Sequence, residues 1–358
     1  VDDVGALCVA HALADRGEVE LLAMLHGTGL EKGAGAISVI NHFYGRDYIP
    51  IGAYRGPVGH PDHTFEPAWT NRGRGWYVAD LVATFPSPIR GAAETLDAVS
   101  VYRRTLAAAP DRSVVIASIG LFTNILDLLE SPADEWSPLA GLDLVQQKVR
   151  HLVVMGGRSN SRWVEWNFAG CGGHNRGCGS FDTFGDLTHD ALALWPSAHA
   201  PISFLEFDAG ADVHTGHILH NATGFEDSPC RRGYVTFCRE MGSSWCPPIG
   251  PAGGRASWDP MAVLYAARGT EGTYRRKRGH NEIDRATGGN VFHEYPTNGT
   301  GSTGPEDDRQ HYLLELVPIG TNETIRAGEV TASKSAIAGT IDGLLLQPPG
   351  VVTPPPPA

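Results

Sequence analysis

Short apolar runs alternate along this chain with stretches that have helical periodicity. Two of the runs, SVVIASIG at 113–120 and HLVVMGG at 151–157, carry apolar side chains on both faces of any strand they form. A strand that is apolar on both faces is typical of a parallel sheet covered by helices on its two sides. The pattern therefore predicts an α/β fold with a mostly parallel open sheet and helices on both faces.

The same periodicity places helices and strands in alternation over most of the chain. Helices are expected at 2–15, 34–44, 93–109, 122–129 and 258–268, and strands at 19–25, 49–54, 113–119, 149–155 and 201–207. His11 falls on the apolar stripe of the first helix and is predicted to be a hydrogen-bonded core residue. Because ligands of parallel sheets bind where the strands end, the functional residues are expected at that edge.

Residues 1–345 are assigned to one domain, and residues 346–358 differ from it in composition. The end of the chain, QPPGVVTPPPPA, is rich in proline, which lacks the backbone donor that helices and inner strands need. It is therefore predicted to be a polyproline II tail or a linker. A disordered tail and a glycosylated stalk like those of hydroxyproline-rich glycoproteins both remain open on the sequence alone.

The charge balance restricts the partners of this protein. The formal net charge is −12 at pH 7, which disfavours binding to the phosphate backbone of nucleic acids. No apolar run approaches the roughly 20 residues that a membrane-spanning helix needs. We therefore predict neither a nucleic acid nor a membrane as a partner. The basic run RRKR at 275–278 is predicted to be a solvated loop.

The six cysteines bear on covalent cross-links. Cys8 falls on the apolar side of the first predicted helix and is predicted to be a buried thiol. The other five are expected to form two disulfides, one between Cys171 and Cys178 and one within the set Cys230, Cys238 and Cys246. A zinc site that includes His174 is an alternative, although the spacing lacks a C-x-x-C knuckle.

Three N-x-[ST] sequons occur in the C-terminal part of the chain, at Asn221, Asn298 and Asn322. Each is a predicted N-glycosylation site, and the proline-rich tail is a further candidate for glycans. Together with the clustered cysteines, the sequons predict an extracellular protein or one of the secretory pathway. A cytoplasmic location is the alternative.

Two adjacent carboxylates, Asp2 and Asp3, stand directly before the first helical pattern. Acidic residues stabilise a helix N-terminus, so capping explains one of them. Two neighbouring carboxylates repel each other unless a cation or strong donors lie between them. A hard divalent cation such as Ca²⁺ or Mg²⁺ would bind these oxygens. From these residues alone, capping and metal binding are both open.

Five segments extend this observation along the chain. They are, in order, VDDVGAL, SIGLFTNILDLL, LVVMGGR, VEWNFAG and ASWDPMAVLYA. Together they resemble the inosine/uridine-preferring nucleoside hydrolase family, and the resemblance runs from residue 1 to about residue 345. The family signature is D-x-D followed shortly by D-D. The chain as given starts at the second pair, so the resemblance implies that a first strand with the D-x-D and its general base precedes it.

The resemblance implies a calcium site. Asp2 and Asp3 match the second aspartate pair of the family, which serves the Ca²⁺ and ribose site, and Asp3 is also predicted to be catalytic. Thr123 matches the position whose backbone carbonyl binds the metal. Asp259 matches the later aspartate ligand. A bound calcium ion would hold the ribose diol and a water whose pKa it lowers.

The resemblance also implies the substrate contacts. Glu165 and Asn167 match residues that hydrogen-bond the ribose hydroxyls, and Asn160 corresponds to a further ribose contact at a shortened spacing. Trp258 replaces the histidine that most relatives have before the metal-binding aspartate. It resembles the purine-preferring branch, in which it would stack on the base and act in catalysis; packing in the core is the alternative. Trp76 belongs to a glycine-rich loop suited to a lid over the base, with packing again as the alternative.

These residues predict calcium-dependent hydrolysis of the N-glycosidic bond of ribonucleosides, with a preference for purines. The alternative is a catalytically inactive, secreted structural glycoprotein that uses this fold as a building block and forms fibres. A third hypothesis is a protein that binds nucleosides or sugars without turnover. A homo-oligomer, in one variant a filament, is the expected state of assembly.

Overall fold

The computed structural model describes residues 1–55, 76–159, 161–169, 185–247, 254–270, 273–295, 310–316 and 327–350, with the backbone alone at 76 and 327–333. Its helices are α1 (Asp2–Asp15), α2 (Glu31–Phe43), α3 (Trp76–Thr84), α4 (Ala98–Ala108), α5 (Thr123–Glu130), α6 (Gly141–Lys148), α7 (Trp166–Ala169), α8 (Gly185–Leu194), α9 (Phe207–Gly210), α10 (Pro229–Met241), α11 (Trp258–Arg268) and α12 (Ala327–Leu345), with 3-10 turns η2 (Ala92–Glu94) and η4 (His217–Asn221). Its strands are β1 (Met24–His26), β2 (Ile51–Ala53), β3 (Leu96–Asp97), β4 (Val114–Ser118), β5 (Val149–Met155), β6 (Ile202–Leu205), β7 (His214–Gly216), β8 (Gly254–Ala256), β9 (Tyr274–Ile283), β10 (Asn290–Glu294) and β11 (His311–Leu316).

Within the described residues, the strands form a large sheet, a smaller one and a short ribbon. The large sheet has the order β10-β9-β11-β6-β5-β4, in which β4, β5, β6 and β11 are parallel and β9 and β10 are antiparallel. The smaller sheet, β1-β2-β3, is parallel, and β7 pairs with β8 in an antiparallel ribbon. The predicted mostly parallel sheet is therefore confirmed, with an antiparallel edge that the sequence did not indicate.

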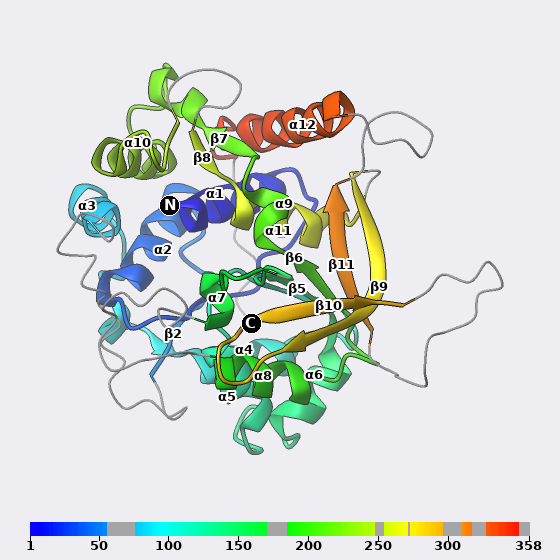
Figure 1. The fold of residues 1–358 in the computed structure, drawn as a ribbon. Helices are drawn as coiled ribbons and strands as arrows, with labels where there is room; N and C mark the ends of the chain where they lie inside the picture. The colour runs from blue at the N-terminus through cyan, green and yellow to red at the C-terminus, as the bar shows by residue number, and fades with distance from the viewer. Residues whose placement is uncertain are drawn as a thin grey trace.

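Helices cover both faces of the large sheet (Figure 1). Alternate residues of β5 point to opposite faces, because side chains alternate along a strand. Val153 and Met155 pack into the core that includes α1, α10, α11 and α12, whereas Leu152 and Val154 pack with α5, α6 and α8. All four side chains are buried. This two-sided burial explains why the run at 151–157 is apolar throughout.

Several elements have the predicted bounds, and others do not. Helices α1 and α11 and strand β5 begin and end where the sequence predicted. The strand predicted at 19–25 is wrong over most of its length, because only β1, at its end, pairs with a neighbouring strand. The helix predicted at 93–109 starts later, because Asp97 caps α4 and its carboxylate accepts a hydrogen bond from the Ser100 amide at 3.0 Å.

The prediction of a solvated loop at 275–278 is wrong, because these residues belong to β9. The basic side chains find acidic partners across the strands: Lys277 Nζ lies 2.8 Å from Glu315 Oε1 and 3.2 Å from Glu294 Oε2. Arg275 also pairs with Glu315, at 2.8 Å. Opposite charges on neighbouring strands stabilise the pairing, so a basic run can belong to a strand that has a neighbour on each side.

The prediction that Cys8 is a thiol is wrong, because it forms a disulfide with Cys230. Its burial was predicted correctly, but its partner lies 222 residues away on α10, which packs against α1. Cys238 and Cys246 form a second disulfide, which confirms a pair within the predicted set. Cys171 and Cys178 lie outside the described residues.

The predicted tail runs from residue 346 to residue 358. Its first part packs on the end of α1, where Arg16 Nε donates to Gln347 Oε1 at 2.6 Å and the Gly350 amide donates to Asp15 Oδ2 at 2.8 Å. Residues 351–358 lie outside the described residues, so the polyproline II conformation stays a prediction.

His11 is the hydrogen-bonded core histidine that the sequence predicted. It is fully buried, and its ring stacks on Tyr44 with 4.7 Å between the ring centroids. Arg46 can only donate, so Nδ1 of His11 accepts from it at 3.4 Å and Nε2 donates to Asn41 Oδ1 at 2.9 Å. Burial is the main reason that the pKa of His11 is lowered to about 4, and the neighbouring Arg46 adds to the effect.

Acidification is expected to destabilise the protein through His11. An unfolded histidine has a pKa near 6.5, so between pH 6.5 and pH 4 the unfolded chain binds more protons than the folded one. The free energy of unfolding should therefore fall over this range, by roughly 3 kcal/mol for this residue. His11→Gln removes the titration, so the stability difference between wild type and variant should shrink on acidification. Urea unfolding at neutral and acidic pH measures it, and a difference that is independent of pH would contradict the assignment.

Candidate functional site

Three of the predicted metal-ligating carboxylates meet at the N-termini of two packed helices. Asp2 and Asp3 lie in the first turn of α1, and Asp259 lies in the first turn of α11, the helix that packs against α1. One oxygen from each lies within 4.8 Å of the others. Negative charge is stabilised at helix N-termini, so both helices favour carboxylates here. Residues that are more than 250 positions apart in the chain thus form one acidic cluster.

The electrostatics of this cluster indicate a shortage of positive charge. Burial is the main reason that the pKa of Asp259 lies well above its usual value, and the carboxylates of Asp2 and Asp3 raise it further. The pKa of Asp3 is also raised, first because its carboxylate is removed from bulk water and then because Asp2 carries a like charge. Its side chain is 61% exposed, but it faces a cavity. For Asp2, burial is the largest single effect and raises the pKa, but the charge of Arg255 and the smaller charge and hydrogen-bond effects together outweigh it, so the pKa of Asp2 is lowered.

The donor set fits a hard divalent cation. Three carboxylates supply oxygen ligands within a span that one ion can bridge, which is the chemistry that Ca²⁺ and Mg²⁺ prefer. Burial and the neighbouring carboxylates raise the pKa of Asp259, so a bound cation would stabilise the ionised form of this cluster. Asp2, Asp3 and Asp259 are therefore the residues of this chain that could hold one.

Thr123 lies at the start of α5, close to the end of β1. Its hydroxyl donates to the Gly27 carbonyl at 3.1 Å, and the neighbouring Asn124 donates to the His26 carbonyl at the same distance. These bonds fix the first turn of α5 against the smaller sheet. The predicted role of the Thr123 carbonyl as a metal ligand stays a prediction.

Glu165 and Asn167 line the cavity beside the carboxyl end of β5. Glu165 Oε2 accepts hydrogen bonds from the backbone amides of Gly157, at 3.0 Å, and Asn167, at 2.9 Å. Burial raises the pKa of Glu165 to about 7, although these amides act in the opposite direction. Asn167 Nδ2 donates to the Met155 carbonyl at 3.0 Å. Both side chains are thus held in place at the strand end, and their contacts with ribose stay predictions.

Trp258 is anchored rather than loosely packed. Its indole Nε1 donates to the Phe207 carbonyl at 2.7 Å, and its ring lies 4.9 Å from the Phe207 ring. Gly210 permits this approach, because a Cβ there would lie 2.5 Å from the Trp258 ring. Trp258 also lines the cavity. Its packing is therefore observed, and its predicted contact with a ligand stays a prediction.

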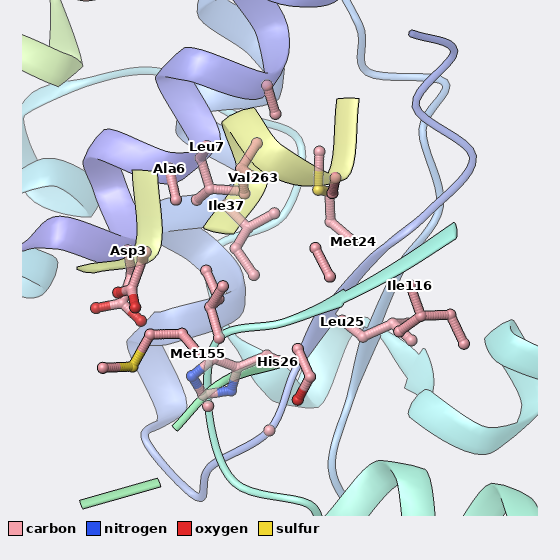
Figure 2. Close-up of a pocket in the computed structure, with 18 of the residues that line it drawn as sticks. Asp3, Ala6, Leu7, Met24, Leu25, His26, Ile37, Ile116, Met155 and Val263 are labelled. Carbon is pink, nitrogen blue, oxygen red and sulfur yellow. The ribbon is translucent and has the colours of Figure 1, made fainter. Parts of the chain in front are cut away.

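A cavity of about 2440 Å³ joins these residues. Figure 2 shows Asp3 and Met155 at one end of the view and Met24, Leu25 and Ile116 at the other. Most of the lining away from the carboxylates is apolar, and it includes residues of β1 and β4, the strands at the facing ends of the two sheets. The expectation of a further strand before Asp2 stays a prediction.

The remaining predicted residues are placed as follows. Trp76 is the first residue of α3, where only the backbone is described. Asn221 ends η4 and is exposed, so its sequon is accessible. Asn160, Asn298 and Asn322 lie outside the described residues. Among the helices of the described part, none has the length and apolar character needed to cross a membrane.

Sequence reasoning missed Arg255, which lies beside the acidic cluster. It is the middle residue of β8, and its Nε donates to Asp2 Oδ1 at 3.3 Å. Its only signal in the sequence is its place four residues before Asp259, within GGRASWD. That spacing does not indicate a contact with Asp2, because the contact depends on the fold, which brings β8 next to the N-terminus of α1.

Comparisons with known proteins agree with this architecture at the level of the fold. No family model matches the chain, and no curated protein matches it either. Among solved structures, a purine-preferring ribonucleoside hydrolase from Gardnerella vaginalis superposes with a TM-score of 0.63 at 15% identity, over 96% of each chain. A plant nucleoside hydrolase superposes with a TM-score of 0.58 at 15% identity, over 97% of this chain and 96% of that one.

A third solved structure has the same fold over nearly the whole chain. An inosine-uridine preferring nucleoside hydrolase from Bacillus anthracis superposes with a TM-score of 0.57 at 14% identity, over 95% of this chain and 96% of that one. The chain therefore has the fold of the nucleoside hydrolases, and the resemblance indicated by the five sequence segments is confirmed for the fold.

Proposed function

We propose that this protein hydrolyses the N-glycosidic bond of ribonucleosides and releases the free base and ribose, with Ca²⁺ as its cofactor. The observation that carries the proposal is the meeting of Asp2, Asp3 and Asp259 at a cavity that Glu165 and Asn167 also line. Oxygen ligands for a hard cation and hydrogen-bonding groups for a diol are thus present in one site. The fold that this chain shares with nucleoside hydrolases supports the same activity.

The proposed mechanism assigns a task to each of these side chains. Asp2, Asp3 and Asp259 hold the cation, which when bound would fix the ribose hydroxyls and lower the pKa of a water molecule. Asp3, the carboxylate that is open to the cavity, is proposed to act in catalysis by orienting the attacking water, whose proton passes to a carboxylate base. The water oxygen bonds to the anomeric carbon, and the base leaves with the electron pair of the broken bond. The transition state resembles an oxocarbenium ion, as in other glycoside hydrolysis.

Glu165 and Asn167 are proposed to orient the ribose. Both are buried at the carboxyl end of β5, where backbone bonds restrict their motion. Trp258 is proposed to border the base, which would favour purines because they offer the larger surface for stacking. Asn160 and Trp76 are proposed to contribute to the ribose site and to a lid.

The two disulfides favour an oxidising compartment, so we also propose that the protein is secreted. The exposed Asn221 sequon agrees with glycosylation there. These observations are equally those of the second candidate function, a structural glycoprotein that assembles with copies of itself. The acidic cluster at a cavity favours the enzyme, because a building block does not need buried carboxylates that repel one another.

Product analysis tests the proposed activity. Incubation with inosine, adenosine and uridine in phosphate-free buffer is expected to release free base and free ribose in equal amounts. Chromatography measures the base and a reducing-sugar assay the ribose. Faster release from the purine nucleosides would support the proposed preference. Absence of ribose from folded protein would favour the structural glycoprotein, and a requirement for phosphate would replace hydrolysis with phosphorolysis.

A further inference from the structure

Two histidines lie close together on the short 3-10 turn η4, outside the cavity. His217 and His220 have the spacing H-x-x-H within the run HTGHILHN. Side chains three residues apart eclipse one another along a 3-10 turn, which has three residues per turn. The centroids of the two imidazole rings accordingly lie 5.7 Å apart. Neither residue belongs to the cavity lining, so the pair is separate from the candidate site described above.

The distance between the rings suits a shared metal ion. Zinc–nitrogen bonds of about 2.0–2.1 Å place the centroids of two imidazoles on one ion roughly 5 to 6 Å apart. Nε2 of His220 is buried and has no hydrogen-bonding partner within the described residues, which is costly for a polar atom unless a ligand binds it. Burial is the main reason that the pKa of His220 is lowered, and His217 adds to the effect. The ring is therefore neutral at pH 7, which is the form that binds metals.

A carboxylate of α12 lies beside this pair. Asp342 Oδ1 accepts a hydrogen bond at 2.7 Å from the amide of Gly216, the residue directly before His217. Burial raises the pKa of Asp342, and the nearby His217 acts in the opposite direction, so the two side chains are close enough to interact. The bond to Gly216 engages Oδ1 and leaves Oδ2 for a further partner.

The backbone that carries the histidines is held from two sides. β7 and η4 lie between α10 and α12 (Figure 1). Arg231 of α10 donates to the His220 carbonyl at 3.1 Å, and Asp342 of α12 holds the Gly216 amide. Both histidine side chains are partly exposed, so their rings can turn on this fixed backbone. Of the described residues, only the three aspartates of the acidic cluster already lie within the span of one ion, so the histidine site closes by such a turn.

We propose that His217, His220 and Asp342 bind a late transition metal ion, for which zinc is the probe. Two imidazoles and one carboxylate form a ligand set that suits zinc, with water in the fourth position, whereas calcium prefers oxygen ligands. The bound ion joins η4 to α12. Because the unfolded chain does not hold these three groups together, the ion stabilises the folded state. The inference is independent of the proposed nucleoside hydrolysis.

Calorimetric titration of the full chain with zinc tests the inference, in excess calcium so that the acidic cluster is occupied. Wild type is expected to bind zinc and to unfold at a higher temperature with zinc than without it. The double variant His217→Gln/His220→Gln is expected to lose both effects. Asp342→Asn keeps an acceptor for the Gly216 amide but removes the charge. It should weaken zinc binding roughly tenfold to a hundredfold, as loss of a carboxylate partner does at other histidine sites.

His199→Gln is the matched control. His199 is an exposed histidine whose Nε2 lies 3.1 Å from Gln146 Nε2, remote in sequence from η4, so this variant should bind zinc as wild type does. The unfolding temperatures without zinc show that each variant is folded. Zinc binding of undiminished affinity in His217→Gln/His220→Gln would overturn the inference, because the ion would then bind elsewhere. Absence of zinc binding by folded wild type would overturn it as well, and neither outcome bears on nucleoside hydrolysis.

Discussion

Asp259→Asn is expected to lower kcat/KM for nucleoside hydrolysis on the order of a thousandfold, which is about 4 kcal/mol in activation free energy. The change keeps the shape of the side chain and removes one of the three charges that would hold the cation. An amide oxygen is a weaker ligand than a carboxylate oxygen. Because the amide is uncharged, only the negative charges of Asp2 and Asp3 remain to hold the cation. Initial rates of ribose release from inosine, at saturating calcium, measure the effect.

The stability of the Asp259→Asn variant without calcium provides the internal control. The pKa of Asp259 is raised well above its usual value, chiefly by burial, so ionisation of this residue costs stability in the folded protein. The variant is therefore expected to unfold, in the absence of calcium, at the same temperature as wild type or a higher one. Asp212→Asn, an exposed residue paired with Lys334, should change neither activity nor this temperature by much. An unchanged rate in Asp259→Asn would contradict the assigned cluster.

Removal of the Cys8–Cys230 disulfide is expected to lower the free energy of unfolding by roughly 4 to 5 kcal/mol. The bond closes a loop with a sequence separation of 222 residues and joins α1, which carries Asp2 and Asp3, to α10. In the chain-entropy description, a long loop restricts the unfolded chain more than a short one does. Urea unfolding of the double variant Cys8→Ser/Cys230→Ser measures the loss.

The second disulfide is the matched comparison for this prediction. Cys238 and Cys246 are separated by 8 residues, so the double variant Cys238→Ser/Cys246→Ser is expected to lose about 2 kcal/mol. The order of the two losses is the diagnostic result. A larger loss for the short loop, or no loss for the long one, would contradict the expectation that the long cross-link holds the α1 end of the site to α10.

The extent to which the sequence predicts this fold depends on burial. Strand β5 is buried on both faces, and its uninterrupted apolar run could therefore be identified with its bounds. Strand β9 is partly exposed and carries the basic run at 275–278, in which Arg275 and Lys277 pair with Glu315 and Glu294 on neighbouring strands. Its identity as a strand depends on those partners, and no local pattern indicates them.

The same distinction applies to the site. Asp2, Asp3 and Asp259 could be found because they belong to sequence segments that resemble a known family, and the structure brings them together. Arg255 belongs to no such segment, and its significance comes from the approach of β8 to α1. Cys8 was correctly predicted to be buried, but periodicity within α1 contains no information about Cys230. Contacts between distant parts of the chain thus account for most of what was missed.

Chelation and restoration of calcium during nucleoside hydrolysis test the proposed function most directly. The protein would be assayed for ribose release from inosine, then with a calcium chelator in excess, and finally after calcium is added back. We predict that release stops on chelation and returns with calcium, because the cation that Asp2, Asp3 and Asp259 are proposed to hold would fix the ribose and lower the pKa of the attacking water. Ribose release that continues unchanged in the chelator, or no release at all from the folded protein with calcium present, would contradict it.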